Sequence, residues 1–128
     1  MENPMATSLT LETIRNAAER IDGKVLRTPV LERHWNDSTL LIKNEGLQSI
    51  GAFKIRGALN KMLQLPDDCP GVVAHSSGNH AQAVARAAKL LGIRAVIVMP
   101  NNAPPLKRMR TEADQAEVII VGPDSDER

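Results

Sequence analysis

The sequence has few aromatic residues and only one cysteine among its 128 residues. Phe53 and Trp35 are the aromatic side chains and tyrosine is absent, so the core must be built from Leu, Ile, Val and Ala. This composition disfavours a single-strand nucleic-acid binder, which stacks bases on aromatic rings. Because Cys69 stands alone, an internal disulfide and a thiolate metal cluster are excluded. We therefore expect no metal site and a reducing compartment, the cytoplasm.

The chain also lacks an excess of either charge and a long apolar run. Sixteen basic and fifteen acidic side chains give a formal net charge of +1. No basic stripe indicates attraction to DNA or to a membrane surface. The polar first ten residues have no apolar signal core, and no window approaches the ~18 apolar residues of a membrane span. We expect a soluble protein with neither a nucleic-acid nor a membrane partner.

The first half of the chain predicts a mixture of helix and short extended segments. Apolar residues recur at helical spacing over 11–21 and again over 53–65, where Pro66 ends the pattern. Residues 40–43 predict a short strand. Residues 27–30 predict an extended turn, because a residue before proline avoids the helical region.

A regular alternation of strands and helices follows. The predicted strands are 71–74, 95–99 and 118–121, and the predicted helices between them are 81–91 and 105–115. Such alternation is typical of parallel βαβ units. Continuous rather than alternating apolar strands indicate a sheet that is covered on both sides. The sequence therefore predicts an α/β fold, with a parallel sheet and helices on both faces.

The segment Ser76-Ser77-Gly78-Asn79-His80 falls where a predicted strand ends and a helix begins. Ligands of parallel sheets bind at the carboxyl ends of strands, and a helix N-terminus suits an anion. Two hydroxyls, an amide and an imidazole surround a turn in which glycine permits close approach of a ligand. The spacing alone is equally consistent with an ordinary N-cap serine and a turn asparagine.

A second candidate is the segment 51–58, which contains Lys54. This lysine opens a predicted helix, where its charge opposes the helix dipole, and such an amine can act as a nucleophile. Taken alone, the pattern fits an ordinary solvated lysine better. Neither a Walker pattern nor a GxGxxG pattern occurs, so the ATP and dinucleotide fingerprints are absent.

Three ordered stretches carry a family resemblance. They are Lys43-x-Glu45-x-x-Gln48-x-x-Gly51-Ala52-Phe53-Lys54-x-Arg56-Gly57-Ala58, then His75-Ser76-Ser77-Gly78-Asn79-His80-Ala81-Gln82, then Met99-Pro100-x-x-Ala103-Pro104-x-x-Lys107. Together they resemble the fold type II pyridoxal-phosphate enzymes, from about Arg27 to Pro123. Ile-Arg-Gly after the lysine and the Ser-Ser-Gly-Asn-His loop resemble the threonine/serine dehydratase and serine racemase branch rather than the cysteine synthases.

The resemblance implies how a pyridoxal 5'-phosphate cofactor would be held. Lys54 would bind it covalently through a Schiff base and serve as a general base. Phe53 would pack against the cofactor ring. Asn79 would form a hydrogen bond with the 3-hydroxyl of the ring. In such a site the cofactor acts as the electron sink and the protein supplies placement.

The resemblance also implies the substrate contacts and the reaction. Ser76, Asn79 and His80 would hold the carboxylate of a small hydroxy amino acid, L-threonine or L-serine. Lys54 would remove the α-proton and the β-hydroxyl would leave, which yields a 2-oxo acid and ammonia. In a racemase, Ser77 would instead return a proton to the opposite face. The alternatives are a racemase of the same family and a non-catalytic domain that serves as a binding or assembly module.

The length of the chain adds an expectation about domains. Family chains are more than twice as long and carry a glycine-rich phosphate loop, whereas no two of the eight glycines here are adjacent. We expect residues 1–50 to belong to a large domain and residues 51–128 to form an incomplete βαβ small domain. A portion of this kind should have little turnover alone and should expose apolar surface. We therefore expect self-association, as a homo-oligomer.

Further expectations concern individual positions and one short basic segment. Ala52 and Gln115 stand where relatives often have serine and glycine respectively, and the second difference is expected to alter a turn. The basic residues of 107–110 are expected to be solvated, and Arg56 is expected to pair with a carboxylate.

Overall fold

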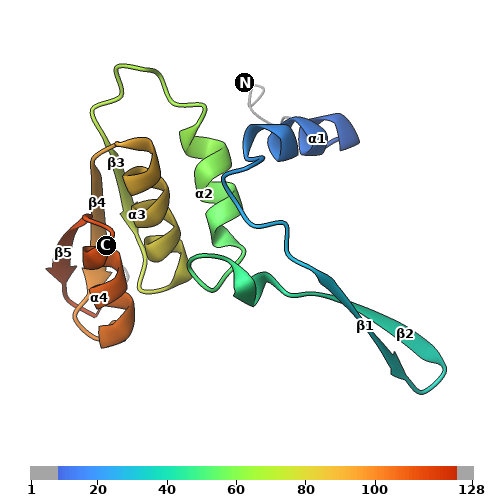
Figure 1. Ribbon diagram of the computed structural model, residues 1–128. Coiled ribbons are helices and arrows are strands. Elements are labelled where there is room, and N and C mark those ends of the chain that lie inside the picture. The colour runs from blue at the N-terminus through green and yellow to red at the C-terminus, as the bar shows by residue number, and fades with distance from the viewer. Residues whose placement is uncertain (1–8, 124–128) are drawn as a thin grey trace, which may run out of the picture.

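The computed structural model describes residues 9–123, and within them it contains helices, a parallel sheet and a separate hairpin (Figure 1). The elements in chain order are α1 (Leu11–Arg20), β1 (Val30–Trp35), β2 (Ser38–Lys43), the 3-10 helix η1 (Glu45–Leu47), α2 (Lys54–Met62), β3 (Val72–His75), α3 (Asn79–Leu91), β4 (Ala95–Pro100), α4 (Pro105–Ala113) and β5 (Glu117–Val121). Each predicted helix and strand is present, with ends that differ by a few residues. The mixed α/β class is confirmed.

The sheet consists of β3, β4 and β5 in that order, all parallel. Val72 lies opposite Ala95, and Val96 lies opposite Glu117. Helices α3 and α4 form the two crossovers. Helix α3 is rich in alanine, the best helix former, and it ends at Gly92, which adopts the left-handed conformation that glycine tolerates.

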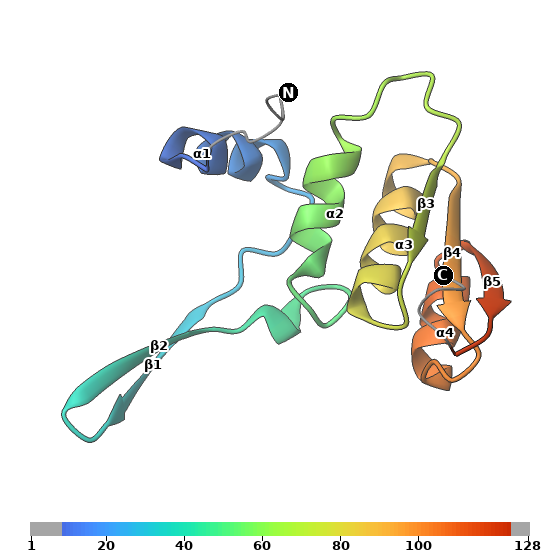
Figure 2. The same ribbon diagram turned by 180° about the vertical axis from the view of Figure 1, so that it is seen from behind.

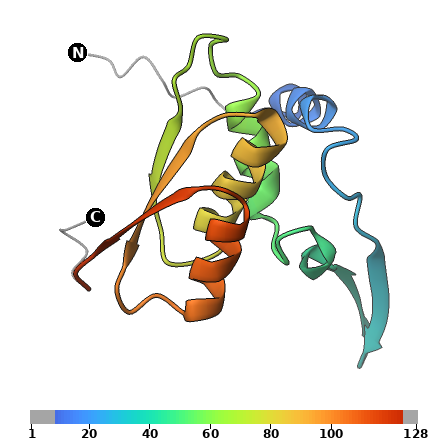
Figure 3. The ribbon, with the colours of Figure 1, turned by 60° about the vertical axis from the view of Figure 1, so that its left-hand side comes forward.

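The helices cover one face of this sheet within the described residues. Figure 3 shows α2, α3 and α4 on the same side of the strands. On β4, Ala95, Ile97 and Met99 are buried, while the residues between them are only half-buried. On the opposite face Val73 of β3 remains 74% exposed. The parallel sheet flanked by helices is thus confirmed, and in residues 9–123 the helical layer lies on one side.

The core beneath that layer is aliphatic, as the composition predicts. Its largest fully buried side chains are Ile55, Leu59, Ile97, Met99 and Thr111. The hydroxyl of Thr111 donates to the carbonyl of Lys107 at 2.9 Å, so its burial leaves no unpaired donor.

Strands β1 and β2 form an antiparallel hairpin that extends away from the other elements (Figures 1 and 2). The sequence predicted β2 but not β1, because Val-Leu-Glu-Arg-His-Trp shows no alternation of apolar and polar residues. The hairpin turn contains Asn36 at a φ of 52°, a conformation that asparagine tolerates.

The register of the hairpin gathers apolar side chains on one face. Leu31 lies opposite Ile42, and Leu40 and Trp35 lie on the same face. All four are exposed, Trp35 to 69%. An isolated two-stranded ribbon is only marginally stable in water. The apolar face of this hairpin is the kind of exposed apolar surface that was expected of the chain.

Helix α1 begins with reciprocal hydrogen bonds between two threonines. The Thr13 N–H donates to Thr10 Oγ1 at 3.1 Å, and the Thr10 N–H donates to Thr13 Oγ1 at 3.0 Å. The helix joins α2 through a hydrogen bond from Arg20 to Asn60. In the span from residue 9 to residue 123, no helix is both long enough and apolar enough to cross a membrane.

Candidate active site

The start of α2 carries the candidate lysine. The turn before it closes with a 2.7 Å hydrogen bond from Gly51 N–H to the carbonyl of Gln48, and Gly51 has a φ of 72°. Lys54 is the first residue of the helix, and no side chain of the described residues caps that helix end. Its Nζ lies 5.3 Å from the centroid of the Phe53 ring, within the range of a cation–π contact. Ile55, the next residue, is fully buried. Its burial fixes the start of the helix, next to the side chains of Phe53 and Lys54.

An ion pair between Glu45 and Arg56 fixes this helix end. Arg56 Nε and Nη2 donate to the two carboxylate oxygens of Glu45, each at 2.8 Å. These hydrogen bonds lower the pKa of the Glu45 carboxyl to about 2, against the opposing effect of burial. The same hydrogen bonds raise the pKa of the Arg56 guanidinium. The expected carboxylate partner of Arg56 is therefore Glu45, eleven residues earlier in the chain.

Two buried polar side chains complete the network around this pair. Thr28 donates to Glu45 Oε1 at 2.6 Å. Gln48 accepts from the Leu26 N–H at 3.1 Å and donates to the Leu26 carbonyl at 2.7 Å. Both side chains are satisfied, as buried polar groups must be. The segment that precedes the hairpin, η1 and the start of α2 are thereby tied together, and this sets the position of Lys54.

The second candidate segment follows β3 directly and forms a tight turn. Ser76 N–H donates to the Val98 carbonyl at 3.1 Å, and Ser76 Oγ accepts from the Gly78 N–H at 3.1 Å. The N-cap of α3 is Gly78, and no side chain of the described residues caps it. Ser76 and Ser77 are therefore not N-caps. The hydroxyl hydrogen of Ser76 and the backbone N–H groups of the first turn of α3 can still donate to an anion.

Asn79, the first residue of α3, is in contact with α4. Lys107 Nζ donates to Asn79 Oδ1 at 3.0 Å. Lys107 is half-buried, whereas residues 108–110 are exposed as expected, so Lys107 is the member of this basic cluster that has a specific partner on another helix. Arg108 does lie on the exposed side, where it pairs with Glu112 of the same helix at 2.8 Å. The contact between Lys107 and Asn79 joins the second and third of the stretches that carry the family resemblance.

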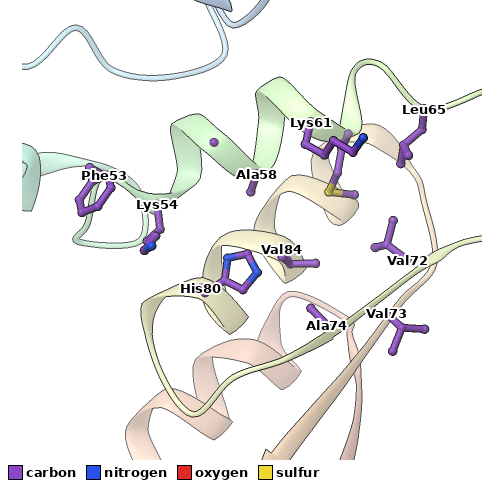
Figure 4. A pocket seen from close by; sticks show the side chains of 12 residues that line it. Phe53, Lys54, Ala58, Lys61, Leu65, Val72, Val73, Ala74, His80 and Val84 are labelled. Carbon is purple, nitrogen blue, oxygen red and sulfur yellow. The ribbon is translucent and has the colours of Figure 1, made fainter. Parts of the chain in front are cut away.

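A cavity of about 510 Å³ lies between α2, α3 and β3 (Figure 4). Phe53, Lys54 and His80 line one end of it, and the close-up shows Lys54 and His80 on facing helices. The remaining wall is mostly apolar, with Lys61 as a second amine.

The predicted site residues thus fall into two groups. Phe53, Lys54 and His80 share the cavity. Ser76, Ser77 and Asn79 do not line it, but they lie on the turn that leads into the helix bearing His80. The structure therefore places Lys54 and His80 in the same cavity. Ser76, Ser77 and Asn79 lie outside its wall.

The residues present fit a cofactor with an aldehyde and a hydroxylated aromatic ring. The Lys54 amine is the group that condenses with an aldehyde. Phe53 supplies an exposed aromatic face beside that amine, and Asn79 supplies an amide for a ring hydroxyl. The uncapped start of α3 suits a carboxylate. Pyridoxal phosphate has such an aldehyde and such a ring, and an amino acid has such a carboxylate.

The sequence predicted a carboxylate partner for Arg56 without identifying Glu45, and it did not predict the contact between Lys107 and Asn79. Glu45 and Arg56 both belong to the first stretch that carries the family resemblance, and Lys107 ends the third. Their place in these stretches was the only sign in the sequence that they matter for the site. Which side chains pair within them depends on how α2, η1 and α4 pack, and no local pattern encodes that packing.

Comparison with known proteins places the chain in a family. Residues 21–128 match the family described as "Pyridoxal-phosphate dependent enzyme". The L-threo-3-hydroxyaspartate ammonia-lyase of Saccharomyces cerevisiae is 46% identical over 116 residues, which cover 86% of this chain and 36% of that protein. The L-threonine ammonia-lyase of Geobacter sulfurreducens is 42% identical over 120 residues, 89% of this chain and 30% of that protein.

A solved structure agrees with these relatives. The structure of maize serine racemase superposes with a TM-score of 0.86 at 44% identity, over 91% of this chain and 37% of that one. The chain thus spans about a third of the length of the proteins that it matches. It belongs to the family of pyridoxal-phosphate-dependent enzymes that the three sequence stretches predicted.

Proposed function

We propose that this chain is the part of a threonine/serine ammonia-lyase that carries the cofactor-binding lysine and the substrate-carboxylate loop. The observation that carries the proposal is the shared cavity, in which Lys54 at the start of α2 faces His80 at the start of α3. Relatives named as ammonia-lyases for threonine and 3-hydroxyaspartate support the reaction class.

Each residue has a role in this proposal. Bound pyridoxal phosphate would withdraw electrons from the substrate Cα. Phe53 would pack against the cofactor ring, and Asn79 would form a hydrogen bond with the ring hydroxyl. Lys54 would hold the cofactor covalently, and its amine, when free, would act as the general base that removes the Cα proton.

The turn before α3 holds the substrate. Ser76, Asn79 and His80 donate to its carboxylate, together with the backbone N–H groups at the helix start. Because His80 lines the Lys54 cavity, a carboxylate held there lies within the same pocket as the base. The β-hydroxyl of L-threonine or L-serine would take up a proton and leave as water, and tautomerisation and hydrolysis of the resulting enamine would give a 2-oxo acid and ammonia.

A racemase is the second candidate, favoured by the likeness to maize serine racemase. In that reaction Ser77 would supply a proton to the face of Cα opposite Lys54. Ser77 is half-buried in the turn between β3 and α3. A hydroxyl in this position is necessary for racemisation but does not by itself exclude elimination.

The proposal extends to organisation and location. Residues 1–50 would belong to a large domain and residues 51–128 to the small domain. The projecting hairpin, with its exposed apolar face, supports this division. We also propose a homo-oligomer, on the same exposed surface, and a cytoplasmic location, on the single cysteine.

Proton exchange in deuterium oxide separates these candidates without requiring rapid turnover. The chain is incubated with pyridoxal phosphate and L-serine, and the amino acid and its products are analysed by mass spectrometry and chiral chromatography. Deuterium in recovered L-serine, with pyruvate and ammonia, supports the lyase. Deuterated D-serine without pyruvate supports the racemase. Absence of any exchange above the Lys54→Ala control contradicts both and favours the binding module.

A further inference from the structure

The hydrogen bond from Lys107 to Asn79 crosses between two helices that are far apart in sequence. The Nζ to Oδ1 distance is 3.0 Å, and the residues are 28 positions apart. Lys107 forms no ion pair with a carboxylate of the described residues, whereas its neighbour Arg108 pairs with Glu112. Asn79 is therefore the side-chain partner of this ammonium group.

Lys107 is held in position by the start of helix α4. It lies in the first turn of α4, whose start is set by Pro104 and Pro105. Its carbonyl accepts from the hydroxyl of Thr111, which is fully buried. A Cβ built on Gly78 would lie 3.5 Å from Lys107 Nζ, so the amine sits directly against the turn before α3.

The contact has a consequence for the free end of the amide. A lysine ammonium has three donors and no acceptor, whereas an asparagine side chain has one oxygen acceptor and one NH₂ donor. Only Oδ1 can face Lys107, so the NH₂ group is the end left for a ligand. A donor in that position binds an ionised oxygen more strongly than a neutral hydroxyl.

We propose that Lys107 is a positioning residue that orients the Asn79 amide, so that its NH₂ group donates to the ionised ring oxygen of pyridoxal phosphate. The inference rests on the proposed function, because it takes Asn79 as the partner of that oxygen. A residue that merely tied α4 to α3 would affect stability and not the ionisation of the cofactor.

The test compares the absorption spectra of the chain and its variants with pyridoxal phosphate bound. Lys107→Met removes every donor, and Lys107→Arg keeps a cationic donor. We expect Lys107→Met to lower the ratio of the ionised to the neutral ring form by up to about tenfold, the value reached if the amide loses its orientation and with it the hydrogen bond to the charged oxygen. Lys107→Arg should restore most of that ratio. Equal ratios in the parent chain and in Lys107→Met would overturn the inference.

A double substitution guards against a general loss of structure. If Lys107 acts through Asn79, then Lys107→Met should change the ratio little further in a chain that already carries Asn79→Ala. Additive changes would mean that Lys107 acts by another route, and would overturn the inference. Should Lys107→Met fail to fold, Lys107→Leu takes its place in the same comparison.

Borohydride reduction of the same samples separates failure of this inference from failure of the proposed function. Labelling at Lys54 with unchanged spectra in the Lys107 variants would contradict the inference alone. Absence of labelling at Lys54 in the parent chain would contradict the proposed function and the inference with it.

Discussion

Glu45 and Arg56 form a two-point ion pair, with both nitrogen–oxygen distances at 2.8 Å, and Arg56 lies two residues beyond the candidate lysine Lys54. The pair joins the segment after the hairpin to the first turn of α2. Because Arg56 also donates to the Leu26 carbonyl at 3.0 Å, the helix that presents Lys54 is held against the segment on which the hairpin begins.

Loss of this pair should destabilise the fold. We expect Glu45→Gln to lower the free energy of unfolding by about 1–3 kcal/mol, because Arg56 loses hydrogen bonds to a charged partner in a half-buried site. Urea denaturation followed by circular dichroism measures the change. The matched control is Glu117→Gln, since the Arg94–Glu117 pair is 70% and 52% exposed and should contribute less than about 0.5 kcal/mol. Equal effects of the two substitutions would contradict the account.

The same pair predicts how stability depends on pH. The pKa of Glu45 is lowered from 4.5 to about 2 in the folded chain, so the unfolded state binds the proton more readily. This contribution is present above pH 4.5 and is lost as the pH falls from about 4.5 towards 2. The stability difference between the parent chain and Glu45→Gln should therefore shrink over that interval. A difference that stays constant would show that the carboxylate charge is not involved.

Burial on one face of the sheet gives a prediction for the core. Ile97 is fully buried beneath the helices, whereas Val73 on the other face is 74% exposed. Ile97→Ala should cost about 2–5 kcal/mol of unfolding free energy, through lost contacts and a cavity. Val73→Ala should cost less than about 0.5 kcal/mol. A comparable loss for Val73→Ala would mean that its face is covered in solution.

The hairpin predicts self-association through one of its faces. Leu31, Trp35, Leu40 and Ile42 share an exposed face, and Leu41 lies on the other. We expect the chain to sediment as a species larger than a monomer, and Ile42→Lys to reduce its size. Leu41→Lys is the matched control on the opposite face and should leave the size unchanged. A parent chain that sediments as a monomer at high concentration would contradict the prediction.

Local patterns predicted most of the parallel sheet and its helices. The short apolar runs at β3, β4 and β5 and the alanine-rich α3 are defined by residues that are neighbours in the chain. Strand β1 was missed because its pairing with β2, and not its own sequence pattern, makes it a strand. Gln115 was expected to alter a turn, and it has a φ of 66°, the left-handed region in which glycine is favoured.

The site could be predicted only as separate segments. Lys54 and the Ser76–His80 turn stood out because their residue types and their places at helix starts are visible in the sequence. The Lys107–Asn79 contact depends on how α4 packs beside α3, and the Glu45–Arg56 pair on how η1 lies beside α2. Neither arrangement follows from spacing along the chain.

The central claim, that Lys54 is the lysine that captures pyridoxal phosphate, is tested most directly by borohydride reduction of the chain mixed with the cofactor, followed by peptide mass mapping. Lys61 serves as the internal control, because it is an amine on the same helix that lines the same cavity. The account predicts that labelling at Lys54 far exceeds labelling at Lys61 and at the other lysines, and that Lys54→Ala abolishes the preferential capture. Equal labelling of Lys54 and Lys61 would contradict it.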